Sequence, residues 1–167
     1  MRYFNIAGPC ISNDHYTIEA FTRLQGVEQL IAQKQYFVIH AARQSGKTTY
    51  LQDLTRRLNA EGKYYTLYCS LESVQNQADP KDGIPGILDN IVLQLQYSSI
   101  PFVYDESYEN DKQHKPLVIL TLFLRDLVKS LDKPLVILFD EADCLSEGTL
   151  ISFLRQLRNG YNDRSMT

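Results

Sequence analysis

The residues best suited to chemistry form a short loop at Ala41–Thr49. Its letters, AARQSGKTT, match the phosphate-loop pattern G-x-x-x-x-G-K-S/T at every fixed position except the first, where Ala41 replaces glycine. Gly46 would let the backbone turn tightly, so that successive N–H groups point at phosphate oxygens. Lys47 would place an ammonium group on the β- and γ-phosphates, and Thr48 would offer its hydroxyl to Mg²⁺. The loop, known as Walker A, therefore predicts a site for ATP.

We expect most of this loop to contact the nucleotide. A helix that begins near Lys47 would direct the positive end of its dipole at the same phosphates. Alanine at position 41 fits the loop as long as its φ angle stays negative. The residues predicted to bind ATP are Ala42, Arg43, Gln44, Ser45, Gly46, Lys47, Thr48 and Thr49.

A pair of acidic residues follows an almost wholly apolar run. Leu135–Phe139 (LVILF) leads directly into Asp140 and Glu141. Carboxylates at the carboxyl end of a parallel strand face the ligand crevice of such sheets. We expect Asp140 to hold Mg²⁺ through water, as a Walker B residue does, and Glu141 to orient or deprotonate the attacking water. The predicted catalytic residues are Glu141 and Lys47, and the predicted metal ligands are Thr48 and Asp140.

The elements that must position these residues alternate between strand-like and helix-like patterns. Three runs rich in β-branched and aromatic residues predict strands, at Tyr36–His40, Tyr64–Cys69 and Leu135–Phe139. We interpret the tyrosines of the second run as packing residues. Helices are expected at Leu24–Gln33, Lys47–Ala60, Ile87–Leu95, Leu117–Leu131 and Leu150–Leu157, with loops at Gln75–Gly86 and Pro101–Lys115. This order predicts an α/β fold with a parallel sheet.

Composition excludes several other classes of protein. A hydrophobic fraction of 44% and a charged fraction of 22% over 167 residues are those of a globular protein, not of a disordered or collagen-like chain. A net charge of -3 gives no indication of nucleic acid as a partner. No apolar run is long enough to span a bilayer. Three widely separated cysteines and a start without a signal peptide predict reduced thiols and a cytoplasmic protein.

Two families of P-loop ATPases resemble this pattern. The literal tetrad Asp140–Asp143 (DEAD) and the alanine at the start of Walker A resemble the DEAD-box helicases. However, no equivalent of that family's P-T-R-E-L-A segment follows the first helix. The chain is more similar to the AAA-like ATPases of bacteria and archaea, near the STAND and archaeal-ATPase groups.

The resemblance to AAA-like ATPases covers most of the chain and rests on several blocks. It implies that residues Tyr3–Pro9, or His15 and Tyr16, touch the adenine base. The blocks are Arg2–Cys10 with His15 and Tyr16, Gln35–Thr49, Asp140–Asp143 and Ser152–Arg158.

The same resemblance implies a P-loop NTPase three-layer fold with a parallel sheet in the order 5-1-4-3-2, of which this chain would supply strands 1–3. We therefore expect residues 1–167 to be the amino-terminal part of a single ATPase domain, with the carboxyl part missing. Residues 1–34 would form an amino-terminal segment and helix, and residues 35–167 the nucleotide-binding core. Without strand four, the strand at Tyr36–His40 would lack its expected neighbour, and its backbone groups would need other partners.

The predicted function is Mg-ATP binding and ATP hydrolysis by an AAA-like module that couples nucleotide state to conformational change. The expected cofactors are ATP and Mg²⁺, and hydrolysis by this chain alone would be weak, because the lid and arginine finger would lie beyond Thr167. Two alternatives stay open. One is a non-hydrolysing nucleotide-binding switch or interaction module, and the other is a DEAD-box-like helicase core fragment. A further protein partner is possible under each reading, and the oligomeric state is left open.

Overall fold

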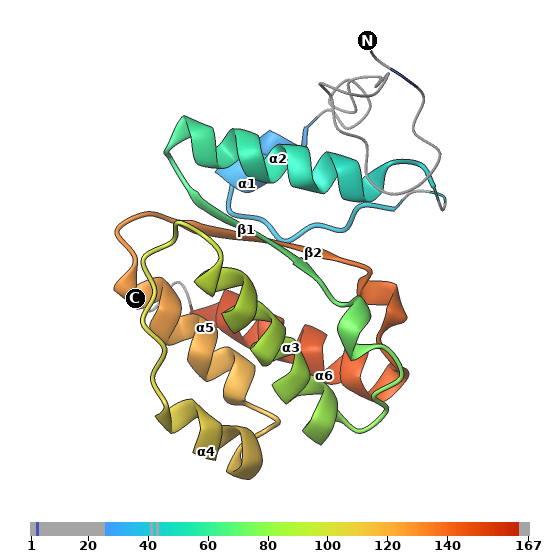
Figure 1. Cartoon of the computed structure of the whole chain (residues 1–167), viewed down its shortest axis with the longest axis vertical. Helices are drawn as coiled ribbons and strands as arrows, with labels where there is room; N and C mark the ends of the chain where they lie inside the picture. The colour runs from blue at the N-terminus through green and yellow to red at the C-terminus, as the bar shows by residue number, and fades with distance from the viewer. Residues whose placement is uncertain (1–2, 4–25, 41, 43, 164–167) are drawn as a thin grey trace.

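A computed structural model describes residue 3, residues 26–40, residue 42 and residues 44–163. In this part of the chain, a two-stranded parallel sheet lies between two layers of helices (Figure 1). The strands are β1 (Tyr65–Ser70) and β2 (Leu135–Asp140). The first layer holds α1 (Val27–Ala32) and α2 (Lys47–Glu61), and the second holds α3 (Pro80–Gln96), α4 (Ser107–His114), α5 (Ile119–Ser130) and α6 (Glu147–Asp163). Two short 3-10 helices, η2 (Glu72–Val74) and η3 (Ala142–Cys144), follow the strands. The chain thus has the predicted α/β architecture in part.

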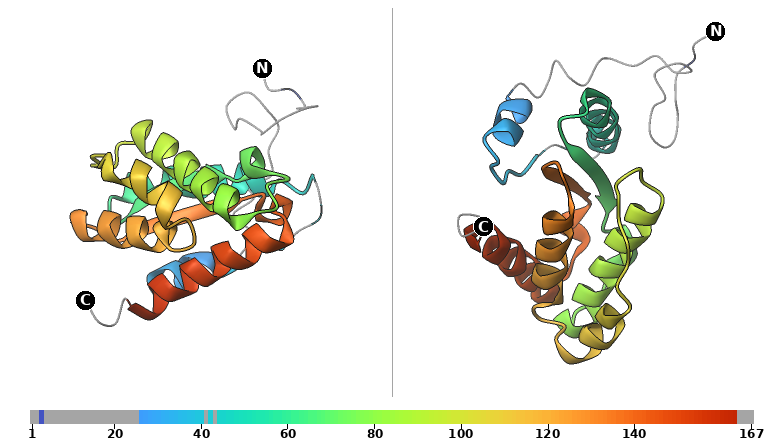
Figure 2. Two further views of the ribbon diagram at one scale, coloured as in Figure 1. Left: turned by 90° about the horizontal axis from the view of Figure 1, so that it is seen from below. Right: turned by 90° about the vertical axis from the view of Figure 1, so that its left-hand side faces the viewer.

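Alternation along the two strands divides the hydrophobic core into two clusters. Leu67 and Cys69 face a larger cluster, which α3, α5 and α6 complete. Tyr68 and Leu138 face a smaller cluster beneath α1 and α2. Because side chains alternate along a strand, Asp140 lies on the same face as Leu138 and is directed toward α2. Figure 2 shows the two helix layers on opposite sides of the sheet.

The register of the sheet fixes which side chains meet at its carboxyl end. The strands pair in parallel from Tyr65 opposite Leu135 to Ser70 opposite Asp140. This pairing confirms that the second and third predicted strands are neighbours, as the order 5-1-4-3-2 requires. The outer edge of β1 is covered by Asn59 of α2, whose Nδ2 donates to the Thr66 carbonyl (2.9 Å) and whose Oδ1 accepts from the Thr66 N–H (2.8 Å). A side-chain amide thus takes the place of a neighbouring strand.

Helix α2 begins and ends where the sequence predicted. Gly46 precedes it with a φ angle of 86°, and Gly62 follows it with a φ angle of 71°. Glycine suits both positions, because a side chain makes this left-handed conformation costly. The buried face of the helix carries Tyr50, Leu51, Leu54 and Leu58, which pack on the smaller cluster.

The predicted strand at Tyr36–His40 is wrong. The segment has no regular secondary structure and joins no sheet among the described residues. Phe37 and Ile39 pack on the smaller cluster, whereas Tyr36 and Val38 are 62% and 76% exposed. A strand is defined by hydrogen bonds to a neighbour, and the described part of the chain places no strand between this segment and β2. The apolar letters therefore predicted a strand whose ladder the described residues do not form.

The two predicted loops contain helices. Helix α3 begins at Pro80, seven residues before the predicted start at Ile87, because Asp79 accepts a hydrogen bond from the Lys81 N–H (2.9 Å) and proline suits the first helical position. Pro85 lies inside this helix near its start. Helix α4 has no buried residue, so it lacks the apolar periodicity that predicts a helix. Tyr108 alone of its residues packs on the larger cluster, against Phe123, and polar contacts such as that of Lys112 with Asp89 hold the rest of the helix.

Helix α6 is longer than predicted and packs closely on α3 and α5. The side chain of Gln156 is buried, and its Oε1 accepts hydrogen bonds from the N–H groups of Leu120 (3.0 Å) and Thr121 (3.2 Å) at the start of α5. Near the start of α6, the side chain of Thr149 lies close to Gly83 of α3. A Cβ atom added to Gly83 would lie 2.3 Å from Thr149 Oγ1. The absence of a side chain at Gly83 therefore allows the two helices to approach. Among the described helices, none has both the length and the apolar character needed to cross a membrane.

We expect Gly83→Ala to lower the free energy of unfolding by up to about 2 kcal/mol, since overpacking typically costs about 1–3 kcal/mol and helix propensity returns about 1 kcal/mol at most. Urea unfolding measures the change. Gly160→Ala in α6 is the matched control, because no atom lies within 4 Å of the added Cβ. That substitution should raise stability by roughly 0.5–1 kcal/mol through helix propensity alone. Stabilisation by both substitutions would contradict the close packing of α3 on α6.

Candidate nucleotide-binding site

The loop before α2 turns through two left-handed residues. Gln44 has a φ angle of 58° and Gly46 one of 86°, and the Ser45 N–H donates to the Ala42 carbonyl at 3.3 Å. The backbone at 44–46 is exposed, and Lys47 follows as the first residue of α2. This arrangement places an exposed turn directly before a helix N-terminus, which suits an anion such as phosphate. Ala41 and Arg43 lie outside the described residues.

Asp140 joins this loop to the sheet. Its side chain is only 4% exposed, and its Oδ2 accepts a hydrogen bond from Thr48 Oγ1 at 2.6 Å. The two residues are 92 positions apart in the sequence. The structure thus brings together the two predicted metal ligands, one from the start of α2 and one from the end of β2.

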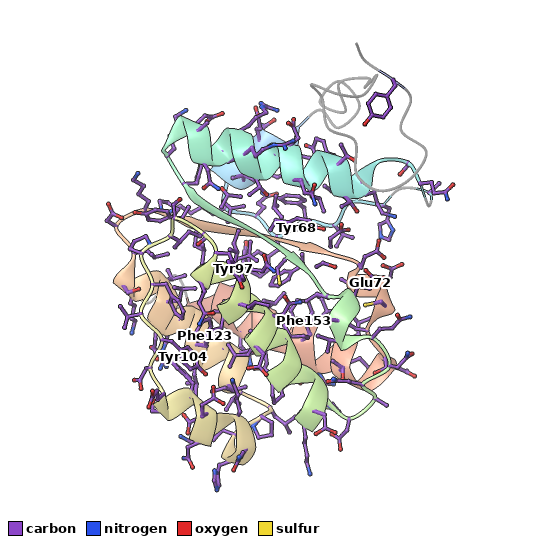
Figure 3. All side chains as sticks on the ribbon, in the orientation of Figure 1. Tyr68, Glu72, Tyr97, Tyr104, Phe123 and Phe153 are labelled. Atoms are coloured by element: carbon purple, nitrogen blue, oxygen red, sulfur yellow. The ribbon has the colours of Figure 1, made fainter. Side chains whose placement is uncertain are left out.

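Two further donors hold the Asp140 carboxylate. The hydroxyl of Tyr68, on the neighbouring strand β1, donates to Oδ2 at 2.9 Å. The backbone N–H of Glu141 donates to Oδ1 at 3.0 Å. A buried carboxylate is tolerated only when hydrogen bonds replace its lost water, and these three donors supply them. Figure 3 shows Tyr68 in the layer between α2 and the sheet.

The state of the Tyr68 hydroxyl follows from its surroundings. Burial raises the pKa of Tyr68 above its ordinary value, and the hydrogen bond to Asp140 raises it further. The hydroxyl therefore keeps its proton at neutral pH and acts as a donor to the carboxylate. The sequence predicted the tyrosines of this strand to be packing residues, which is correct for the Tyr68 ring and incomplete for its hydroxyl. The alternation of β1 was the signal, since it places Tyr68 on the same face as the acid.

Glu141 differs from Asp140 in exposure and backbone conformation. It has a φ angle of 57° and a ψ angle of 32°, and its side chain is exposed. A left-handed conformation at a non-glycine residue costs about 1–2 kcal/mol. Such strain is concentrated at functional sites, where the surrounding structure maintains it. The strained backbone turns the Glu141 side chain out of the sheet, beside the buried acid.

The residues at this place fit Mg²⁺ as a ligand set. Thr48 and Asp140 offer oxygen atoms, which Mg²⁺ prefers, and they already lie within hydrogen-bond distance of each other. The described residues contain no cluster of three or more His, Cys, Asp or Glu side chains that could hold a metal. A Mg²⁺ ion bound with a nucleotide does not need one, because phosphates and water supply most of its ligands.

The comparison with protein families decides which kind of P-loop protein this is. Residues 31–167 match the family described as AAA domain. The chain belongs to the AAA domain family. A search of curated proteins and a search of solved structures each found no match. Membership in the AAA domain family indicates nucleotide binding, confirms the predicted AAA-like P-loop ATPase domain, and leaves the STAND and archaeal-ATPase subgroups as a prediction.

Other predicted features of the AAA domain are not tested by this geometry. The residues expected near the adenine base, Tyr3–Pro9 and His15 with Tyr16, lie outside the described residues except for Tyr3. Of the predicted ATP ligands, Arg43 also lies outside them. The other predicted ATP ligands lie in the turn that precedes α2 or directly after it. They are Ala42, Gln44, Ser45, Gly46, Lys47, Thr48 and Thr49.

We expect Thr48→Val to lower the free energy of unfolding by about 1.5 kcal/mol or more, because a hydrogen bond to a buried charge is lost. Urea unfolding without nucleotide or metal measures this loss. Thr55→Val in the same helix is the matched control, since its hydroxyl donates only to the Leu51 carbonyl one turn earlier. Equal losses in the two variants would mean that the contact between Thr48 and Asp140 does not stabilise the fold.

Proposed function

We propose that this AAA domain binds Mg-ATP between the Walker A turn and the end of β2, and hydrolyses it. The observation that carries the proposal is the 2.6 Å hydrogen bond between Thr48 and Asp140. It joins one residue of each predicted motif at the carboxyl end of a parallel sheet, where ligands of such sheets bind. The turn at 44–46 and the start of α2 supply the anion-binding groups beside this pair.

In the proposed site, different residues act on the phosphates, the metal ion and the attacking water. Lys47 binds the phosphates as a cation, and the backbone N–H groups of the turn bind their oxygens. Thr48 and Asp140 hold Mg²⁺, which neutralises charge on the phosphates when it is bound. Glu141, exposed beside the buried acid, positions the attacking water and accepts its proton. Its exposure suits this role, since the water must reach it from solvent.

The sequence supports further proposals about the chain as a whole. We propose that nucleotide state is coupled to a conformational change, and that residues 1–34 and 35–167 divide the chain as an amino-terminal segment and a nucleotide-binding core. The described cysteines, Cys69 and Cys144, are free thiols. This supports the proposal of a reducing, cytoplasmic setting. The AAA domain match supports this family over the DEAD-box alternative.

We expect calorimetry to detect saturable Mg-ATP binding by the purified chain, and Lys47→Ala to weaken it at least about tenfold. The reason is that a charge-assisted contact contributes about 1.5–3 kcal/mol. Lys63→Ala is the matched control, since this exposed lysine follows the opposite end of α2 and pairs with Glu61. No binding by a folded wild-type chain, or equal affinity of the two variants, would refute the proposed site.

We expect slow ATP turnover that falls about 100-fold or more in Glu141→Gln, with the affinity for Mg-ATP unchanged, because a positioned base contributes about 10²–10⁴-fold. Phosphate release under single-turnover conditions measures the rate. Asp143→Asn, an exposed acid two residues further on, is the control. Binding without turnover, unaffected by Glu141→Gln, would favour the alternative of a non-hydrolysing nucleotide switch.

A further inference from the structure

Among the described donors to Asp140, Tyr68 is the one that belongs to neither predicted motif. It lies on β1, and its Cα atom pairs with Leu138, two residues before the acid. Diagonal neighbours of this kind on adjacent strands are within reach of a long aromatic side chain. The ring of Tyr68 packs on the smaller cluster, which holds its hydroxyl at 2.9 Å from Asp140 Oδ2.

The hydrogen bonds on Asp140 leave little freedom to its carboxylate. A carboxylate has about four lone-pair positions on its two oxygens. Thr48 and Tyr68 both donate to Oδ2, and the Glu141 N–H donates to Oδ1. Among the described hydrogen bonds, Oδ2 thus accepts two and Oδ1 accepts one. The donors to Oδ2 determine the rotation of the carboxylate and hence the direction in which Oδ1 is presented.

Thr48 and Tyr68 differ in what else they must do. Under the proposed function, the Thr48 hydroxyl has to serve Asp140 and the metal ion at the same time. The Tyr68 hydroxyl donates to Asp140 and has its other side-chain hydrogen bond with Gln52 of α2, on a strand that is paired along its length with β2. The proposed function gives this hydroxyl no contact with nucleotide or metal.

We propose that Tyr68 is a positioning residue that orients the Asp140 carboxylate for Mg²⁺. This inference rests on the proposed function and adds a residue outside both motifs to that site. Residues that hold a metal ligand in place contribute substantially to metal affinity, and their replacement typically costs about 10–100-fold. The hydroxyl of Tyr68, rather than its ring, carries this role.

The test compares two tyrosines of the same strand. Tyr68→Phe removes the hydroxyl and keeps the ring in the core. Tyr65→Phe is the matched control, because the Tyr65 hydroxyl also donates to a carboxylate, that of Asp132 at 2.8 Å, near the amino end of the strand and away from the site. Circular dichroism and urea unfolding check that both variants fold.

The measurement is ATP affinity by calorimetry at a series of Mg²⁺ concentrations and in excess chelator. We expect Tyr68→Phe to raise the Mg²⁺ concentration for half-maximal tightening about tenfold, and to leave the metal-free ATP affinity within about twofold. Tyr65→Phe should change neither value. The same Mg²⁺ dependence in Tyr68→Phe and wild type would overturn the inference while the proposed function stands. No ATP binding by folded wild-type chain would overturn both.

A second measurement tests the contact itself without nucleotide. Urea unfolding of Tyr68→Phe, Asp140→Asn and the double variant forms a double-mutant cycle. If the hydroxyl acts through Asp140, the effects of the two substitutions do not add. Additive effects would show that the two side chains do not interact in solution, and would overturn the inference independently of ATP binding.

Discussion

The buried carboxylate of Asp140 is the constraint on which the arrangement of the site depends. Taking a carboxylate out of water costs several kcal/mol unless donors replace its hydration. Here those donors come from three elements: Thr48 at the start of α2, Tyr68 in β1, and the Glu141 backbone after β2. Satisfying one charge therefore determines the position of the phosphate-loop helix relative to both strands. Loss of any donor leaves a charge with fewer partners in an almost fully buried place.

The two hydrophobic clusters support this polar centre from opposite sides. The smaller one, between α1, α2 and the sheet, holds the helix that follows the phosphate loop against the strand face that carries Asp140. The larger one fixes β1 and β2 from the other side through α3, α5 and α6. Polar side chains satisfy backbone groups that the sheet and the helices leave without a backbone partner. Asn59 does so at the edge of β1, and Gln156 at the start of α5.

Strain and exposure separate the two acids that follow one another in the sequence. Asp140 ends a regular strand and is buried, whereas Glu141 adopts a left-handed backbone and is exposed. Two adjacent carboxylates thus have different environments, one surrounded by hydrogen-bond donors and one open to water. A metal-holding role and a water-positioning role require this difference, because the first needs a fixed group and the second needs access to solvent.

The sequence by itself determined what depends on local chemistry. Gly46 and Lys47 predicted the turn and the start of α2, and the apolar run before Asp140 predicted β2. Tertiary structure decided whatever requires a partner distant in the sequence. Tyr36–His40 is unpaired because a strand needs a neighbour, and the close approach of Gly83 to Thr149 exists only because α3 packs on α6. The hydroxyl of Tyr68 became a donor to Asp140 through the register of two strands some 70 residues apart, which the alternation of β1 by itself does not give.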